Sequence, residues 1–149
     1  RDVVRSLMEQ GIRQVLVLNG HGGNFVLEPA IQAINYEWPS VRVVMPTDVW
    51  AITDDGEALF ETAEHEVHGG EAETSVMLYL DRAHVKAERV DATPPVGREY
   101  LDYVTLDRLS RDGVWGSPSH ADAAKGERAL AAQVRAVVAF ARRALGAPS

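Results

Sequence analysis

The sequence contains no cysteine, so the chain forms no disulfide bond and offers no thiolate to a metal. It has no apolar run of the roughly 20 residues that span a bilayer, and its first residues lack the pattern of a secretory signal. Basic residues are scarce, with 15 Lys and Arg against 22 Asp and Glu, and they are scattered. A nucleic-acid partner or an anionic membrane surface is therefore disfavoured. A cytoplasmic enzyme is the expectation that remains.

Three catalytic signatures are also missing from the chain. It has no Gly-x-Ser-x-Gly elbow, no Walker phosphate loop and no dinucleotide fingerprint, so serine nucleophiles and nucleotide binding have no support. What is present is globular in character. Apolar residues make up 46% and charged residues 25% of the 149 positions, which fits one domain with a sizeable core. We expect a single domain over residues 1–149.

The N-terminal third alternates between helical and strand patterns. A helix is predicted over residues 3–11, a buried strand over 12–18, a helix over 26–38 and a second strand over 41–45. This order is typical of a strand–helix–strand unit with a right-handed crossover, and it predicts a mostly parallel α/β sheet. Because the chain enters a helix directly at Arg1, we expect that an N-terminal part is missing.

The remainder of the chain gives weaker patterns. The predicted elements are a short helix at 57–62, a helix at 71–80, a strand at 85–90, an irregular stretch at 91–103 and a final helix at 120–145.

A glycine-rich loop at residues 19–24, Asn-Gly-His-Gly-Gly-Asn, follows the first predicted strand. Ligands of α/β sheets bind outside the carboxyl ends of the strands, and glycine allows positive φ and close approach of the backbone. His21 has no bulky neighbour to shield it, so its imidazole is a candidate metal ligand or base. The alternative is a turn whose histidine only bonds the backbone. The loop context favours a functional residue.

A second histidine loop at residues 68–75, His-Gly-Gly-Glu-Ala-Glu-Thr-Ser, leads into the helix predicted at 71–80. His68 and Glu71 share a face if helical geometry has begun, and Glu73 points elsewhere. Imidazole and carboxylate together suit Zn²⁺, Mn²⁺ or Fe²⁺. The alternative is electrostatic, because acidic residues in a first helical turn stabilise its positive end.

Several further residues are weaker candidates. Asp48, Trp50 and Trp115 are interpreted as possible walls of a substrate pocket, although turn and packing roles suit them equally well or better. The residues that we interpret as solvated are His65, Glu66, His84 and His120.

Residues 19–24, residues 68–75, and residues 113–118 followed by Lys125-Gly126 occur in this order along the chain. Together they resemble the creatininase (creatinine amidohydrolase) family, over essentially the whole sequence. The resemblance implies a three-layer αβα sandwich with a mostly parallel sheet, a homo-oligomer such as a hexamer, and a centre of two divalent metal ions. It also implies hydrolysis of a C–N bond in a small amide or formamide by a metal-activated water.

The resemblance also implies roles for single residues. His21 matches a metal-ligand histidine, and His68 matches a histidine that assists catalysis beside the substrate. Glu73 belongs to the same site as a catalytic residue. True creatininases carry a glutamate ligand two residues after the first histidine, where this chain has Gly23, so we hypothesise that Glu71 replaces that ligand.

One further departure concerns the N-terminal metal ligands of the family, a Glu-x-His pair and a bridging Asp, which have no counterpart in this sequence. The chain therefore resembles the C-terminal portion of a family member. Three alternatives stay open: a peptide-trimming member of the mycofactocin type, a non-catalytic remnant or assembly subunit of the same fold, and a small-molecule binding module.

Overall fold

The computed structural model describes residues 1–47, 53–54 and 56–146. The chain divides into two units, Arg1–Val49 with Arg135–Ser149, and Trp50–Val134. The C-terminal helix α5 (Ala123–Gly146) contributes residues to both units. None of the helices in the described ranges combines the length and apolar character that crossing a membrane requires. The expectation of one domain over the whole chain stays a prediction.

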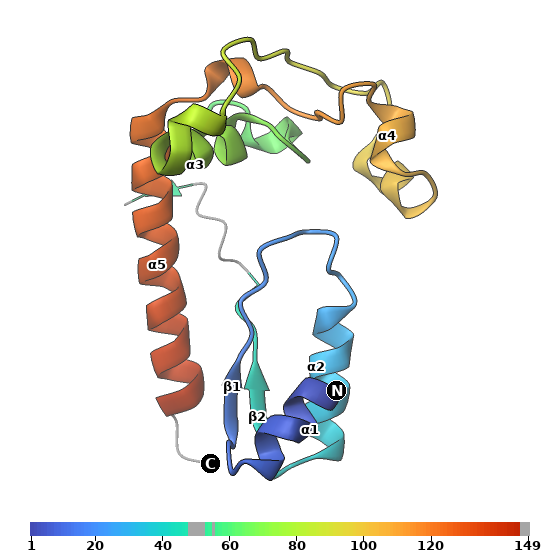
Figure 1. Ribbon diagram of the computed structural model, residues 1–149, viewed down its shortest axis with the longest axis vertical. Coiled ribbons are helices and arrows are strands. Elements are labelled where there is room, and N and C mark those ends of the chain that lie inside the picture. Colours follow the sequence, from blue (N-terminus) through green and yellow to red (C-terminus); the bar gives the residue numbers. More distant parts are fainter. Residues whose placement is uncertain (48–52, 55, 147–149) are drawn as a thin grey trace. The chain divides into compact units, whose positions relative to one another are not determined.

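The first unit contains the predicted strand–helix–strand order (Figure 1). Helix α1 (Asp2–Glu9) precedes strand β1 (Gln14–Leu16), and helix α2 (Leu27–Glu37) leads to strand β2 (Arg42–Val44). The two strands are parallel, with Val15 opposite Val43. Both strands are shorter than the sequence predicts. The three-layer sandwich stays a prediction, since the sheet of the described residues in this unit has two strands.

The core of the first unit lies where α1 and α2 pack on the strands. Val4, Ile34, Val41 and Val43 are buried there, and each such aliphatic side chain contributes about 1.5–3 kcal/mol to stability. Asn35 of α2 binds the backbone of β2, because its amide donates to the Val43 carbonyl at 2.7 Å and accepts from the Val43 N–H at 2.8 Å. The amide thereby substitutes for a neighbouring strand.

Side chains of the two strands also bind the C-terminal end of α5. Gln14 Nε2 donates to the Leu145 carbonyl at 2.8 Å, and Arg42 Nη1 donates to the Ala144 carbonyl at 3.2 Å. The last carbonyls of a helix lack partners within the helix, so these two donors satisfy groups that the helix leaves open.

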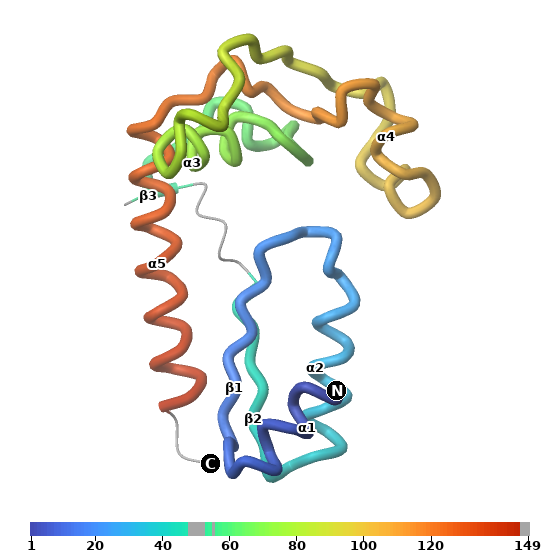
Figure 2. The backbone as a smooth tube through the Cα atoms, in the orientation of Figure 1, coloured from blue at the N-terminus to red at the C-terminus, as the bar shows by residue number. Residues whose placement is uncertain are grey.

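The second unit consists of short elements joined by long irregular segments (Figure 2). One of these short elements is helix α4 (Leu106–Leu109). Helix α3 (Glu71–Asp81) confirms the helix predicted at 71–80. Strands β3 (Thr53–Asp54) and β4 (Glu57–Ala58) form an antiparallel hairpin. The 3₁₀ turns are η1 (Ala63–His65), η2 (Arg82–His84), η3 (Arg98–Asp102) and η4 (Pro118–His120).

Two predicted elements of the second unit are wrong. Residues 57–62 are not a helix, because Glu57 and Ala58 pair with β3 and the chain then turns into the core. Residues 85–90 are not a strand, since within the described structure they form no ladder with another segment. An alternation of polar and apolar residues predicts a strand only where a partner edge is available.

The core of the second unit is built from Leu59, Phe60 and Ala129, where the first half of α5 packs close to α3. Gly126 allows this approach. A Cβ atom at that position would overlap the backbone carbonyl of Ser75, which leaves room only for hydrogen. The Lys125-Gly126 pair singled out in the sequence therefore lies at a helix contact.

Candidate functional site

The first histidine loop lies at the carboxyl end of β1, as predicted, and its conformation is fixed by its two asparagines. Asn19 Oδ1 accepts hydrogen bonds from the His21 N–H at 3.2 Å and from Asn24 Nδ2 at 3.0 Å. The Asn24 N–H in turn donates to the His21 carbonyl at 3.1 Å. The two asparagines therefore hold the loop in this conformation.

The ring of His21 folds back over its own loop. The Gly23 N–H donates to His21 Nδ1 at 2.9 Å, and a Cβ atom at residue 23 would lie 2.9 Å from the ring. Gly23 is therefore required for close approach of the ring rather than for a positive φ angle. In a neutral ring whose Nδ1 accepts this bond, the proton is on Nε2.

The second histidine loop is held by the segment that contains Trp115. The His68 N–H donates to the Trp115 carbonyl at 3.0 Å, and the Trp115 N–H donates to the His68 carbonyl at 2.8 Å. Gly69 follows in the left-handed region, with φ of 63°, so the chain turns sharply into α3. Residues 113–118 thus position a predicted catalytic histidine from 47 residues away in sequence.

His68 and Glu73 lie together at this turn. Glu73 Oε2 accepts the Gly69 N–H at 2.5 Å and lies 4.0 Å from His68 Nδ1. Both side chains are partly exposed, at 47% and 41%. The structure therefore brings together the two residues predicted as catalytic and leaves both accessible to a ligand.

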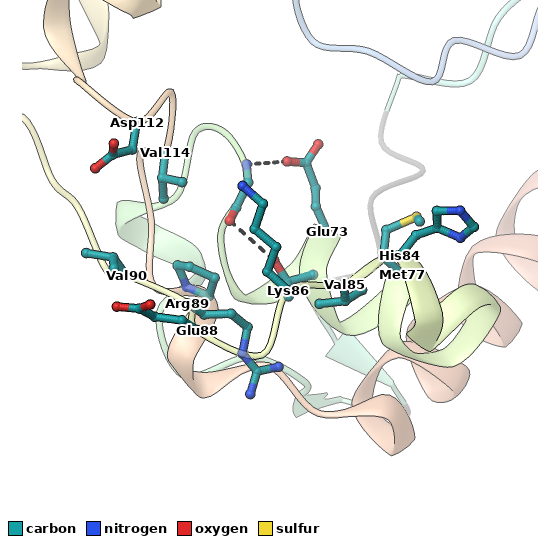
Figure 3. Close-up of a pocket in the computed structure, with 13 residues that line it drawn as sticks. Glu73, Met77, His84, Val85, Lys86, Glu88, Arg89, Val90, Asp112 and Val114 are labelled. Carbon is teal, nitrogen blue, oxygen red and sulfur yellow. Dashed lines mark hydrogen bonds between the residues drawn. The ribbon is translucent and has the colours of Figure 1, made fainter.

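A cavity of about 650 Å³ lies beside this turn, with Glu73 in its lining (Figure 3). This volume is typical of small-molecule sites. Its walls come from the turn at Gly69, from α3, from residues 84–90 and from the segment that follows Ser110. The lining residues are Gly69, Glu73, Thr74, Met77, His84, Val85, Lys86, Glu88, Arg89, Val90, Asp112, Val114 and Pro118.

Glu66 is a site residue that the sequence interpretation missed, because it was taken as solvated. Its carboxylate accepts the Glu71 N–H and, at 3.1 Å, the Ala72 N–H, which are the first two donors of α3. Gly70, at the N-cap position, has no side chain for this purpose. Glu66 therefore caps the helix that carries Glu73. Glu66 lies only five and six residues before the N–H groups that it accepts. It was missed because the known helix-capping patterns place the capping side chain closer to the helix or inside its first turn.

Glu71, predicted as a metal ligand, is fully buried with both carboxylate oxygens occupied. Oε1 receives Lys125 Nζ at 2.5 Å. Oε2 accepts the backbone N–H groups of Glu61 and Thr62 at 2.8 and 2.9 Å, and the Thr62 hydroxyl lies 3.0 Å away. A metal ion would have to displace one of these donors, and the ligand role of Glu71 stays a prediction.

The Glu71 carboxylate is held in its charged form. Burial raises its pKa, but the hydrogen bonds from Lys125 and Thr62 outweigh burial, so the net pKa is lowered. Burial likewise lowers the pKa of Lys125, whereas Glu71 and Glu61 raise it by more, and its net pKa is raised. Lys125 Nζ also reaches Glu61 Oε1 at 2.9 Å and the His120 carbonyl at 3.3 Å, which uses all three ammonium hydrogens.

The remaining predicted residues are placed as follows. Trp115 is buried at 4% exposure and is not in the cavity lining, so its substrate contact stays a prediction. Asp48 and Trp50 lie outside the described residues. His65, His84 and His120 are exposed as expected. His84 is paired with Asp81 and His120 with Glu61.

Comparison with known proteins identifies the family. The model of the creatininase family, described as creatinine amidohydrolase, matches residues 1–141. This chain belongs to the creatininase family. The curated relatives include a mycofactocin precursor peptide peptidase of Mycobacterium tuberculosis, 32% identical over 127 residues, covering 82% of this chain and 45% of the relative. A creatinine amidohydrolase of Pseudomonas putida is 27% identical over 150 residues, covering 92% and 58%.

Solved structures of creatininase-fold proteins are also similar. A Bacteroides fragilis protein, named as a candidate creatinine amidohydrolase, has a TM-score of 0.75 and 31% identity, covering 96% of this chain and 58% of that one. Creatininases in a Zn–Zn form and a Mn form superpose with TM-scores of 0.71 and 0.72 at 27% and 28% identity, each covering 96% of this chain and 61% of theirs. The chain thus spans about half the length of the curated relatives it matches.

A metal centre needs several donor side chains that lie close together. Within the described ranges, no group of three or more His, Asp and Glu side chains is placed to hold a metal ion. His68 and Glu73 are donors of suitable chemistry, but they are a pair, and His21 Nδ1 is engaged by Gly23. By themselves, the described residues do not fit a complete metal centre.

Proposed function

We propose that this creatininase-family chain acts as a hydrolase that cleaves the C–N bond of a small amide or formamide. The observation that carries the proposal is the convergence of His68 and Glu73, 4.0 Å apart, beside a cavity of about 650 Å³. An imidazole and a carboxylate at an accessible turn are the groups that proton transfer in amide hydrolysis requires.

In this proposal His68 acts on the leaving nitrogen. Amide cleavage releases a strongly basic nitrogen, which departs easily only when it receives a proton, and a partly exposed imidazole can supply one. Glu73 restrains the turn by accepting the Gly69 N–H, which limits the positions open to the ring. His68 itself is held by the pairing of its loop with Trp115.

We further propose that the hydrolase uses divalent metal ions, Zn²⁺, Mn²⁺ or Fe²⁺, with two per site as in the family resemblance. When bound, such an ion supplies a water of lowered pKa. The support is the similarity to creatininases in Zn–Zn and Mn forms. His21 keeps its proposed ligand role provided that its bond with Gly23 opens.

A second candidate function is peptide trimming. The support for it is the 32% identity to a mycofactocin precursor peptide peptidase over 127 residues. The same residues of this chain would cleave a peptide bond, so the two candidate functions differ only in their substrate.

The proposal is tested by assaying the chain, with Zn²⁺ or Mn²⁺ added, on creatinine, on an N-formyl amine and on short peptides. We expect release of formate or amine that falls at least about 100-fold in His68→Ala, the lower range for a general acid or base. The matched control is His65→Ala, an exposed histidine three residues earlier. Equal activity in His68→Ala and the parent chain would remove His68 from the mechanism, and turnover of peptides alone would favour trimming.

A further inference from the structure

The cavity beside Glu73 contains charged groups that the proposed reaction does not use. Lys86 and Arg89 lie on the irregular segment 85–90, and three carboxylates, Glu73, Glu88 and Asp112, also line the walls. Figure 3 shows Lys86 extending toward the Glu73 end of the cavity and Arg89 extending the other way from the same segment.

The segment that carries these two cations is anchored at both of its ends. At one end the Val85 N–H donates to the Arg82 carbonyl at 3.2 Å. At the other end Asp91 accepts the N–H and the hydroxyl of Ser119 at 2.9 and 2.6 Å, and Ala92 pairs with Gly116. A loop fixed in this way on a scaffold presents its side chains at a defined place, as binding loops do.

Neither cation is neutralised within the part of the chain that the structure describes. Lys86 and Arg89 make no ion pair or side-chain hydrogen bond there, although Arg89 is half-buried. A partly buried guanidinium has five N–H donors to satisfy, and an anionic ligand is a suitable acceptor. The Lys125 ammonium, in contrast, is completely paired.

The mixture of charges restricts the ligand. The three carboxylates would repel a polyanion such as an oligophosphate, whereas a single carboxylate beside an amide N–H matches both signs. Lys86 provides the cation for the carboxylate, and Glu73 provides an acceptor for the amide N–H. Because Lys86 extends toward Glu73, the two ligand groups are expected to be neighbours, as in an N-acyl α-amino acid.

We infer that this cavity binds an N-acyl amino acid, or the C-terminal residue of a peptide, with Lys86 holding its carboxylate. The inference rests on the proposed function and names its substrate class. In the hydrolysis of N-formylglycine, the oxygen of water bonds to the formyl carbon, the C–N bond breaks, and the nitrogen takes up a proton. The products are formate and glycine.

The test compares two probes that differ only in the carboxylate, N-formylglycine and N-formylglycinamide. Dissociation constants are measured by ligand-detected NMR, separately from formate release. We expect the chain to bind N-formylglycine about tenfold more tightly, the scale of one charge-assisted hydrogen bond. Lys86→Met is expected to remove this preference, Lys86→Arg to retain it, and Arg98→Met, an exposed residue outside the cavity, to leave it unchanged.

The two proposals fail in different ways. Equal binding of the two probes, no binding of either, or an unchanged preference in Lys86→Met would overturn the carboxylate site, even if formate were released. A carboxylate preference that depends on Lys86 but is accompanied by no hydrolysis of any amide would uphold the site and reject the hydrolase. Circular dichroism of each variant establishes that it is folded.

Discussion

Glu71 and Lys125 are the clearest case of single residues that determine local stability. The Lys125 ammonium and the Glu71 carboxylate form an ion pair, which replaces the hydrogen bonds to water that each group lost on burial. The carboxylate is fully buried. A buried charge that loses its partner is strongly destabilising.

We therefore predict that Lys125→Met lowers the free energy of unfolding by about 3 kcal/mol, the lower end for a broken buried pair, because Thr62 still donates to Glu71. Urea denaturation followed by circular dichroism measures this difference. Arg98→Met, at an exposed position, is the control. A loss no greater than in the control would contradict the assigned role of the pair.

The same pair predicts a pH dependence. The folded pKa of Glu71 is lowered from its usual 4.5, so its contribution is present above about pH 4.5 and is lost as pH falls through the lowered value. The folded pKa of Lys125 is raised from 10.5, so its contribution is complete below that pH and is lost at higher pH. The stability difference between the parent chain and Lys125→Met should therefore be greatest between these limits. A difference that stays constant from pH 7 down to pH 2 would contradict this expectation.

Sequence reasoning identified Glu71 and His68 as important but could not assign what each one contacts. Lys125 lies 54 residues after Glu71, and the partner of His68 lies 47 residues after it. Helical spacing reports neighbours three or four residues apart and carries no information about such distant pairs. The loop motifs could therefore be recognised in the sequence. The sequence could not show that the carboxylate of Glu71 is buried and structural whereas that of Glu73 is accessible.

At the scale of an element, α3 depends on a cap from outside the helix. We predict that Glu66→Ala lowers the free energy of unfolding by about 1–2 kcal/mol, because two N–H groups at the start of α3 lose their acceptor. Glu66→Gln should cost less, since its amide oxygen still accepts. Chemical denaturation gives both values, and the exposed neighbour Glu64→Ala is the control. Equal losses in all three variants would reject the cap.

The contact between α3 and α5 gives a second prediction at this scale. Gly126→Ala places a methyl group against the Ser75 carbonyl, and we expect a loss of about 1–3 kcal/mol from overpacking. Gly146→Ala is the matched control in the same helix, because no atom lies near its added Cβ. Thermal unfolding of both variants distinguishes a packing clash from a general effect of replacing glycine. A Gly126→Ala variant as stable as the control would contradict the close contact.

The elements that were predicted correctly are those in which burial and periodicity agree. In α1, β1, α2 and β2 apolar side chains recur with the expected period and form one core. The segment 85–90 is also predicted as a strand, but hydrogen bonds from the N–H and hydroxyl of Ser119 to Asp91 fix its end in a loop instead of a ladder. A sequence pattern cannot indicate that a strand has no partner edge.

At the scale of the whole molecule, the resemblance to the creatininase family is confirmed, and the hexamer that it implies stays a prediction. Metal binding is the property that tests the proposed site as a whole. We predict that elemental analysis of the purified chain finds Zn, Mn or Fe, with the remaining ligands supplied from outside the described residues, and that His21→Ala lowers the metal content. The control is His84→Ala, an exposed histidine paired with Asp81. An equal metal content in the parent chain and His21→Ala would exclude His21 as a ligand.

The contrast between Lys86 and Lys125 makes the chain suited to selective chemical labelling. The sequence has two lysines, and the ammonium of Lys125 has all its hydrogens bonded and a raised pKa, which makes it a poor nucleophile toward acylating reagents. Lys86 is exposed. Apart from the terminal amine, an amine-reactive reagent should therefore attach at Lys86, and a ligand carboxylate bound there should protect Lys86 from acylation.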